Sequence, residues 1–210
     1  NRYYIASICD IMKFLASSEL PMRGDKETCE QYLDTGSVSS AGLILKLFEF
    51  TLRKDAKLRD VQKRIPKNAK YTSPEIQNQI ISLLAKMVQD TIVREVRAAD
   101  VPYYTLKVDG TKDSTGTENI AIVVRYVMAG KPVEHLLTIA TTVDLDAEAL
   151  LTTVLTALEI AGLDPRNIIS QCYDGASVMS GLHGGLQAKL QQHLSKEIPY
   201  VHCYNHQLHL

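Results

Sequence analysis

Three runs rich in β-branched and aromatic residues decide the fold: YYTLKVD (103–109), NIAIVVRYVM (119–128) and VEHLLTIATTV (133–143). Short stretches that contain turn residues, such as Gly110 and Gly130, separate these runs. Runs of this kind joined by short connections predict three consecutive strands. We expect the strands to pair with one another as an antiparallel meander.

The chain after this meander alternates between helical and strand patterns. Asp146 opens a helical pattern whose apolar stripe ends at Gly162. A strand follows over 167–173, then a helix over about 183–194 and a short strand over 198–203. The order of three strands, helix, strand, helix and strand predicts an α/β fold of the RNase H-like type. In that fold the first and fourth strands of a mixed sheet lie adjacent and parallel.

The residues before the meander have helical periodicity. The expected helical segments are Tyr3–Leu20, Ala41–Leu52, Val61–Ile65 and Ser73 to about Asp100, with a loop over 21–39. Ser73 can cap the last of these helices, and Pro74 at its first position has no N–H that would need a partner. We therefore expect a helical N-terminal region over 1–100 and the first part of an RNase H-like core over 101–210.

Composition bounds the class of protein. The chain has 210 residues, of which 45% are hydrophobic and 22% are charged, as in ordinary globular domains. Apolar runs such as Ile120–Val124 are far shorter than the ~20 residues of a membrane span, so no membrane helix is expected. The first residues lack a basic segment leading into a cleavable apolar one, and they predict an internal fragment boundary rather than a signal peptide.

Cysteine usage points to a reducing compartment. The four cysteines are scattered along the chain: Cys9, Cys29, Cys172 and Cys203. This spacing does not form a disulfide framework, so we expect reduced thiols in an intracellular protein.

The first half of the chain contains one strongly basic run. Residues 53–70 hold two acidic residues and eight basic ones, namely Arg53, Lys54, Lys57, Arg59, Lys63, Arg64, Lys67 and Lys70. Such a run can form a stripe that faces a polyanion. It can equally be the solvated face of a helix and the loop after it.

Two aspartates, Asp109 and Asp174, stand at the predicted ends of the first and fourth strands. If these strands adjoin in parallel, the two carboxylates can hold a hard divalent cation that activates a water or a 3′-hydroxyl. The alternative is that each aspartate ends a strand or caps a turn, which is common for Asp-Gly sequences. A two-metal site needs a further acid. Asp113 is an auxiliary candidate that we expect to be exposed, and no convincing candidate follows Asp174.

Cys203 and His206 have the spacing of zinc ligands, with His202 and His209 close by. A structural zinc site normally has four ligands, and the other cysteines offer no partner motif. We therefore expect Cys203 to be buried as a small apolar residue and His206 to form hydrogen bonds near the acidic site. A zinc-binding interaction module is the alternative. The sequence has no Walker-type lysine motif and no Gly-x-Ser-x-Gly elbow, and no small-molecule cofactor is expected.

Several short motifs occur in the order found in one known family. They are Phe14–Ala16, Leu20–Asp25, Val108–Asp113, Val124–Tyr126, Tyr173–Gly181 and Val201–Leu210. With these motifs the chain resembles hAT-superfamily transposases, in particular the transposase-derived domain of MYM-type zinc finger proteins. The resemblance implies an RNase H-like core that acts on transposon DNA ends with Mg²⁺ or Mn²⁺. It also implies a nuclear protein that forms homo-oligomers.

The resemblance assigns roles by position. Asp109 matches the first catalytic, metal-binding aspartate and Asp174 the second, while Cys203 and His206 match a Cys-x-x-His near the active site and the transposon end. The third acid of the family is a glutamate that follows a large helical insertion. Neither is present here, and the N-terminal zinc-binding finger is also absent. We therefore expect the front part of a catalytic core, inactive by itself. The alternative is a domesticated nuclear scaffold that binds DNA or proteins without cleavage.

Overall fold

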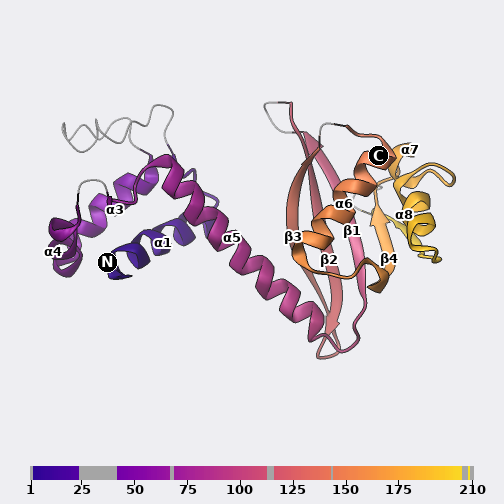
Figure 1. The fold of residues 1–210 in the computed structure, drawn as a ribbon, viewed down its shortest axis with the longest axis horizontal. Helices are drawn as coiled ribbons and strands as arrows, with labels where there is room; N and C mark the ends of the chain where they lie inside the picture. The colour runs from indigo at the N-terminus through magenta and orange to yellow at the C-terminus, as the bar shows by residue number, and fades with distance from the viewer. Residues whose placement is uncertain are drawn as a thin grey trace. The chain divides into compact units, whose positions relative to one another are not determined.

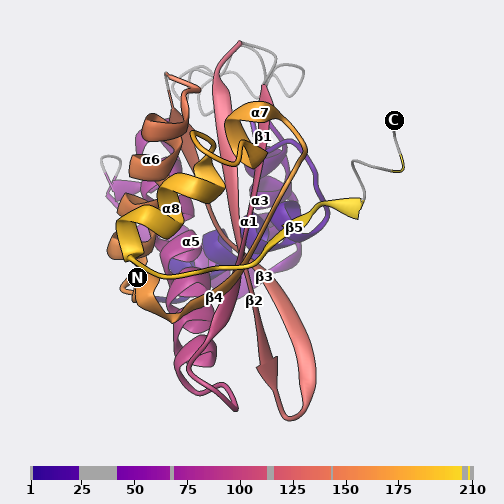
Figure 2. The same ribbon diagram turned by 90° about the vertical axis from the view of Figure 1, so that its right-hand side faces the viewer.

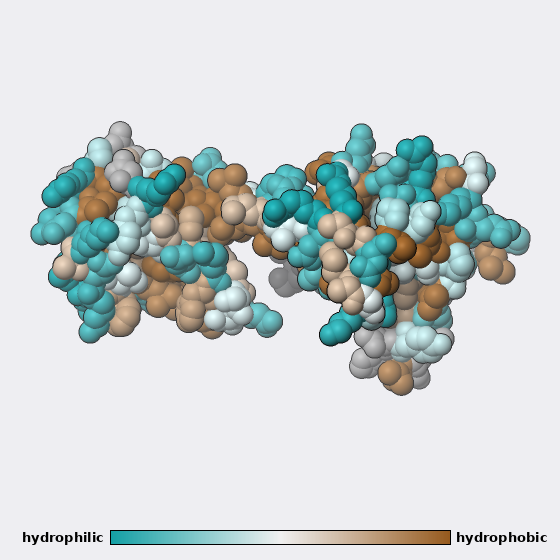
Figure 3. All heavy atoms as spheres, turned by 90° about the horizontal axis from the view of Figure 1, so that it is seen from below, coloured by the Kyte–Doolittle hydropathy of each residue, from teal (hydrophilic) through white to brown (hydrophobic). Residues whose placement is uncertain are grey.

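The computed structural model describes residues 2–23, 42–66, 69–112, 116–142, 144–204 and 208. The chain divides into two compact units, Asn1–Ala85 and Lys86–Leu210 (Figure 1). This division falls inside one long helix, α5 (Pro74–Arg97). The boundary near residue 100 that the sequence suggests stays a prediction. Seen from below, hydrophilic side chains cover much of the surface of each unit, with apolar side chains exposed among them (Figure 3).

The first unit is helical and has its own core. It contains α1 (Arg2–Ser17), α3 (Leu43–Lys54), α4 (Ala56–Arg64) and the start of α5. Apolar residues of α1 recur every three or four positions, so one face of the helix is buried. Tyr4 on this face packs edge-on against Phe48 of α3, with ring centroids 5.3 Å apart.

The predicted helices are confirmed, with shifts at their ends. α1 ends at Ser17, three residues earlier than expected. α4 begins at Ala56 rather than near Val61, because the Asp55 carboxylate accepts a hydrogen bond from the Leu58 N–H and caps the helix. Ser73 caps α5 as predicted, with its hydroxyl 3.4 Å from the Ile76 nitrogen. Most of the predicted loop over 21–39 lies outside the described residues.

The second unit is built on a five-stranded sheet of order β3-β2-β1-β4-β5 (Figures 1 and 2). Its strands are β1 (Tyr104–Lys112), β2 (Glu118–Met128), β3 (Lys131–Thr142), β4 (Ile168–Tyr173) and β5 (Tyr200–His202). β1, β2 and β3 pair antiparallel, whereas β4 lies parallel to both β1 and β5. This topology confirms the predicted RNase H-like α/β fold.

Helices connect the later strands. They are α6 (Ala147–Ala161), the 3₁₀ turn η2 (Pro165–Asn167), α7 (Ser177–Ser180) and α8 (Leu186–Leu194). Asp146 caps α6 by accepting hydrogen bonds from two backbone N–H groups, and Gly162 ends it with a φ of 76°. α7 was not expected from the sequence. None of the helices in the described ranges is long and apolar enough to cross a membrane.

The two faces of the sheet differ in burial. Alternate strand residues such as Leu106, Ile122 and Val124 are fully buried in a core that also includes the apolar stripe of α6. α6 and α8 lie on this side of the sheet (Figure 2). The residues that alternate with them along the strands point to the other side of the sheet, and the residues on that side that matter below are not buried. We call this side the open face; its residues are Lys107, Asp109, Arg125, Glu134 and Cys172.

Candidate active site

The parallel pairing of β1 with β4 sets the expected positions of the two candidate acids. The last aligned pair of this ladder is Lys107 with Cys172. Asp109 and Asp174 each follow two residues later on their own chain segment. Since side chains two residues apart lie on the same face, the register predicts adjacent carboxylates on the open face. Asp109 is exposed and Asp174 is half-buried.

The expected position of Asp109 at a strand end is wrong. β1 continues to Lys112, because Gly110–Lys112 remain paired with Glu118–Ile120 of β2. An ion pair of 3.1 Å between Lys112 and Glu118 joins the two strands there. Only β4 ends at the acid pair, so the backbone of Asp109 is fixed by an antiparallel ladder and that of Asp174 by a turn.

Asp174 is held by its own turn and by β5. Its Oδ1 accepts a hydrogen bond from the Ala176 N–H at 3.1 Å, so this aspartate does cap a turn. Its backbone carbonyl accepts a hydrogen bond of 2.8 Å from the hydroxyl of Tyr200. These contacts fix the direction of the carboxylate before any ligand binds.

Gly175 lies against the side chain of His202, a histidine of β5. His202 pairs with Tyr173 across the β4–β5 ladder, which continues as the Cys203 N–H donates to the Tyr173 carbonyl at 2.7 Å. A Cβ added at Gly175 would lie 2.7 Å from Cε1 and 2.9 Å from Nε2 of His202. A larger residue after Asp174 would therefore require the His202 ring to move, and nothing in the sequence signals this contact.

The placement of β5 depends on a fully buried amide that the sequence analysis missed. Gln171 of β4 donates through Nε2 to the carbonyl of Ile198 at 2.9 Å. Gln191 of α8 accepts a hydrogen bond of 3.0 Å from the Ile198 N–H. These two glutamines bind both backbone polar groups of one residue, Ile198, just before β5. A polar residue inside a strand gives no sequence signal for such a role.

The loop that follows Asp174 is closely packed. The Ser180 hydroxyl lies 3.0 Å from the carbonyl of Gly175, and the Gln187 side-chain amide donates to the Ser180 carbonyl. Further on, a Cβ at Gly185 would lie only 2.4 Å from the backbone nitrogen of Gly181. The two glycine backbones therefore touch. After this contact α8 begins at Leu186 rather than at about His183.

Two thiols lie near one another, one on β4 and one just after β5. Cys172 and Cys203 are both half-buried free thiols, so Cys203 is less buried than expected. Burial, and next the neighbouring Cys203, raise the pKa of the Cys172 thiol above its usual value. Cys172 is therefore a protonated, weakly nucleophilic thiol at neutral pH. His206, His209, Asp113 and Cys29 lie outside the described residues.

The charged side chains of the open face form ion pairs. Lys107 lies 2.7 Å from one carboxylate oxygen of Glu134, and Arg125 lies 3.9 Å from the other. This cluster spans β1, β2 and β3 on the same face as Asp109.

The basic run of the helical unit also makes internal contacts. Arg53 lies 3.9 Å from Glu49, and Lys63 lies 3.6 Å from Asp60. The Lys57 ammonium lies 4.5 Å from the ring centroid of Tyr3. Lys67 lies outside the described residues, and the polyanion-facing role of the run stays a prediction.

The donor atoms of the acid pair fit a hard divalent cation. Carboxylate oxygens are the ligands that Mg²⁺ and Mn²⁺ prefer. Within the described ranges, no three or more His, Cys, Asp or Glu side chains are grouped to hold a metal ion. Asp109 and Asp174 would therefore supply two ligands, with the remaining positions left to water, substrate or further acidic residues.

Comparison with known families decides the classification. A family model described as ZMYM1/FAM200, RNase-like domain matches residues 1–185. The chain belongs to this family. The match confirms the resemblance to a transposase-derived domain with an RNase-like core, and it includes both Asp109 and Asp174.

One solved structure is similar in part. YeaZ from Pseudomonas aeruginosa is 17% identical, with a TM-score of 0.26. The similarity covers 48% of this chain and 44% of that chain, so this chain spans less than half of YeaZ. A similarity of this size carries no argument about the RNase-like domain.

Proposed function

We propose that the chain is the front part of a hAT-type, transposase-derived core that cleaves and transfers DNA strands in the full-length protein with Mg²⁺. The parallel pairing of β1 with β4 supports this proposal, because its register, continued by two residues, predicts that Asp109 lies beside Asp174. Membership of the RNase-like domain family supports it independently. Work on chromosomal DNA would place the full-length protein in the nucleus.

Asp109 and Asp174 would hold the metal ion, as the first and second acids of the site. A bound Mg²⁺ would help to activate the attacking water or 3′-hydroxyl and stabilise the leaving oxygen of the phosphodiester. The β1–β2 ladder keeps Asp109 in place, while the Ala176 N–H and the Tyr200 hydroxyl orient Asp174. A further acidic ligand, a glutamate by the resemblance, would complete the site in the full-length protein.

A strand-cleavage assay tests this function. The full-length protein is incubated with Mg²⁺ and duplex DNA that carries its terminal inverted repeats. Wild type, Asp109→Asn, Asp174→Asn and Asp10→Asn are compared, the last as a control because Asp10 is an exposed partner of Lys13 on α1. We expect the control to cleave like wild type and the two site variants to lose measurable cleavage.

The other outcomes contradict the proposal in different ways. Equal cleavage by wild type and Asp109→Asn removes Asp109 from the mechanism. A wild-type protein that binds the repeats but cleaves none of them, at any Mg²⁺ or Mn²⁺ concentration, is the domesticated DNA-binding scaffold instead.

A further inference from the structure

The basic run of the helical unit separates into paired and unpaired side chains. Two of its members form the ion pairs described above, and the Arg59 guanidinium donates to two backbone carbonyls at the end of α3. By contrast, no carboxylate of the described residues forms an ion pair with Lys54, Lys57 or Arg64. All three side chains are exposed. Three cations of the run are therefore available to an anionic ligand.

The α3–α4 junction keeps these three cations close together. Lys57 and Arg64 are seven residues apart on α4, so they lie on the same side of the helix, about 10 Å apart along its axis. Lys54 is the last residue of α3, and the single residue Asp55 links α3 to α4. The positive charges therefore extend from the end of α3 along one side of α4.

Two exposed aromatic rings accompany the lysines. The Lys54 ammonium lies 5.9 Å from the ring centroid of Phe50, and the Lys57 ammonium lies 4.5 Å from that of Tyr3. Phe50 is 52% exposed and Tyr3 is 39% exposed. The Tyr3 hydroxyl donates to the carboxylate of Asp55, which ties this ring to the start of α4. Cations beside exposed aromatic rings are the combination with which proteins bind single-stranded nucleic acid, because phosphates contact the cations and bases stack on the rings.

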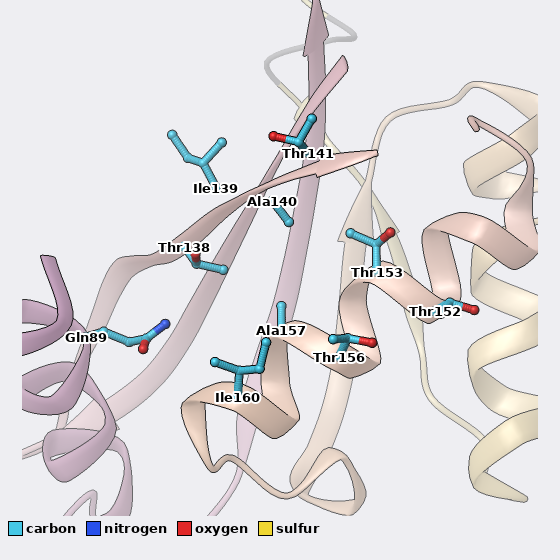
Figure 4. Close-up of a pocket in the computed structure, with 10 residues that line it drawn as sticks. All are labelled: Gln89, Thr138, Ile139, Ala140, Thr141, Thr152, Thr153, Thr156, Ala157 and Ile160. Carbon is cyan, nitrogen blue, oxygen red and sulfur yellow. The ribbon is translucent and has the colours of Figure 1, made fainter. Parts of the chain in front are cut away.

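The second unit offers a polyanion no comparable site among its described residues. Residues 86–210 carry 10 basic and 14 acidic residues, whereas residues 1–85 carry 13 and 10. A cavity of about 390 Å³, lined mainly by β3 and α6, contains no charged side chain, and half of its ten residues are threonines such as Thr138 and Thr156 (Figure 4). A polyanion is therefore attracted to the helical unit rather than to this cavity.

We propose that the α3–α4 junction binds single-stranded nucleic acid. The strand-binding surface consists of Tyr3, Phe50, Lys54, Lys57 and Arg64. Lys57 and Arg64 contact phosphates of one strand two helical turns apart, and a base stacks on the exposed ring of Phe50. The surface uses neither Asp109 nor Asp174, so it does not depend on the proposed function.

Fluorescence anisotropy tests this surface. A labelled single-stranded oligodeoxynucleotide, and a duplex of the same sequence, are titrated with the 210-residue chain at several salt concentrations. EDTA is present, so that no divalent cation can join DNA to the acid pair. We expect the wild type to bind the single strand more tightly than the duplex, with an affinity that falls as salt rises.

The first variant removes charge from the surface. The double variant Lys57→Gln/Arg64→Gln should bind the single strand at least about tenfold more weakly at low salt. Its salt slope should be about 1.4 smaller, because each neutralised phosphate of a single strand contributes about 0.7. The matched control, Lys86→Gln/Lys131→Gln, removes two exposed lysines of the second unit and should bind like wild type.

The second variant removes the ring. Phe50→Ala should bind the single strand about fivefold more weakly with an unchanged salt slope, because stacking releases no counterions. Phe14→Ala is the matched control, since Phe14 is a 54% exposed phenylalanine of α1 that lies outside the basic run. This control should bind like wild type.

Four results overturn the proposal. They are no binding of the single strand by wild type at low salt, duplex binding at least as tight as single-strand binding, wild-type affinity and salt slope in the folded Lys57→Gln/Arg64→Gln variant, and wild-type affinity in Phe50→Ala. Circular dichroism checks that each variant folds. If the double variant does not fold, Arg64→Gln alone replaces it, with an expected change in salt slope of about 0.7.

Discussion

The two faces of the sheet carry different kinds of residue. The covered face packs against α6 and α8 and carries buried apolar side chains, whereas the open face carries the candidate catalytic residues. Leu106 and Val108 of β1 are buried beneath α6 and its neighbours, while Lys107 and Asp109 alternate with them on the open face. Because successive strand residues point to opposite sides, two adjacent positions can belong to different tasks. Substitutions one residue apart in β1 should therefore affect different properties.

The largest expected effect is on the covered face. Leu106→Ala removes a side chain with no exposed surface and should lower the free energy of unfolding by about 2–5 kcal/mol. Lys107→Ala, the matched change on the open face, removes a half-exposed ion pair and should cost less than about 1 kcal/mol. Urea unfolding, with hydrogen exchange of the β1 and β2 amides as a local readout, measures both. An equal loss of unfolding free energy in the two variants would contradict this difference between the faces.

A smaller effect is expected in the loop that supports Asp174 from the covered side. Gly185→Ala would place a Cβ within 2.4–2.9 Å of the backbone of Gly181, so one backbone must move. We expect a loss of about 1–3 kcal/mol in unfolding free energy, the usual cost of overpacking. Gly184→Ala is the control, because a Cβ there meets nothing within 4 Å and should leave stability nearly unchanged. If the neighbouring variants unfold at the same urea concentration, the close contact of the two glycines is not real.

The smallest expected effect is on the reactivity of the Cys172 thiol, which lies on the open face. Burial raises the pKa of Cys172, so its thiolate is scarcer in the folded protein than in the unfolded chain at the same pH. The rate of alkylation by iodoacetamide, followed by peptide mass spectrometry, should rise with an apparent pKa above the ordinary value of about 8.5. Urea-unfolded protein supplies the reference. An apparent pKa at or below that reference would mean that Cys172 is an activated thiol rather than a shielded one.

The sequence predicted the sheet well because its signals are local. The runs over 103–109, 119–128 and 133–143 alternate between covered and open positions, and Gly162 and Asp146 mark the ends of α6 with their own backbone chemistry. The order of the elements then leaves few topologies, which is why the adjacency of β1 and β4 followed.

The sequence could not predict what depends on contacts between distant segments. Gln171 and Gln191 both bind the backbone of Ile198 before β5, and His202 contacts Gly175, only after the chain has folded. The continuation of β1 past Asp109 depends on pairing with β2. The sequence alone does not show this pairing, because glycine at position 110 is typical of a turn. The roles of Asp113 and His206 stay predictions, because both lie outside the described residues.

The central claim is that Asp109 and Asp174 together hold one divalent cation, and binding of Mn²⁺ to the full-length protein tests it most directly. Free Mn²⁺ is measured by electron paramagnetic resonance during titration of wild type, Asp109→Asn, Asp174→Asn and the Asp10→Asn control. We predict at least about tenfold weaker binding for each site variant, because each loses a charged oxygen ligand, and wild-type binding for the control. Wild-type binding by Asp109→Asn or Asp174→Asn, or no binding by wild type, would contradict the account.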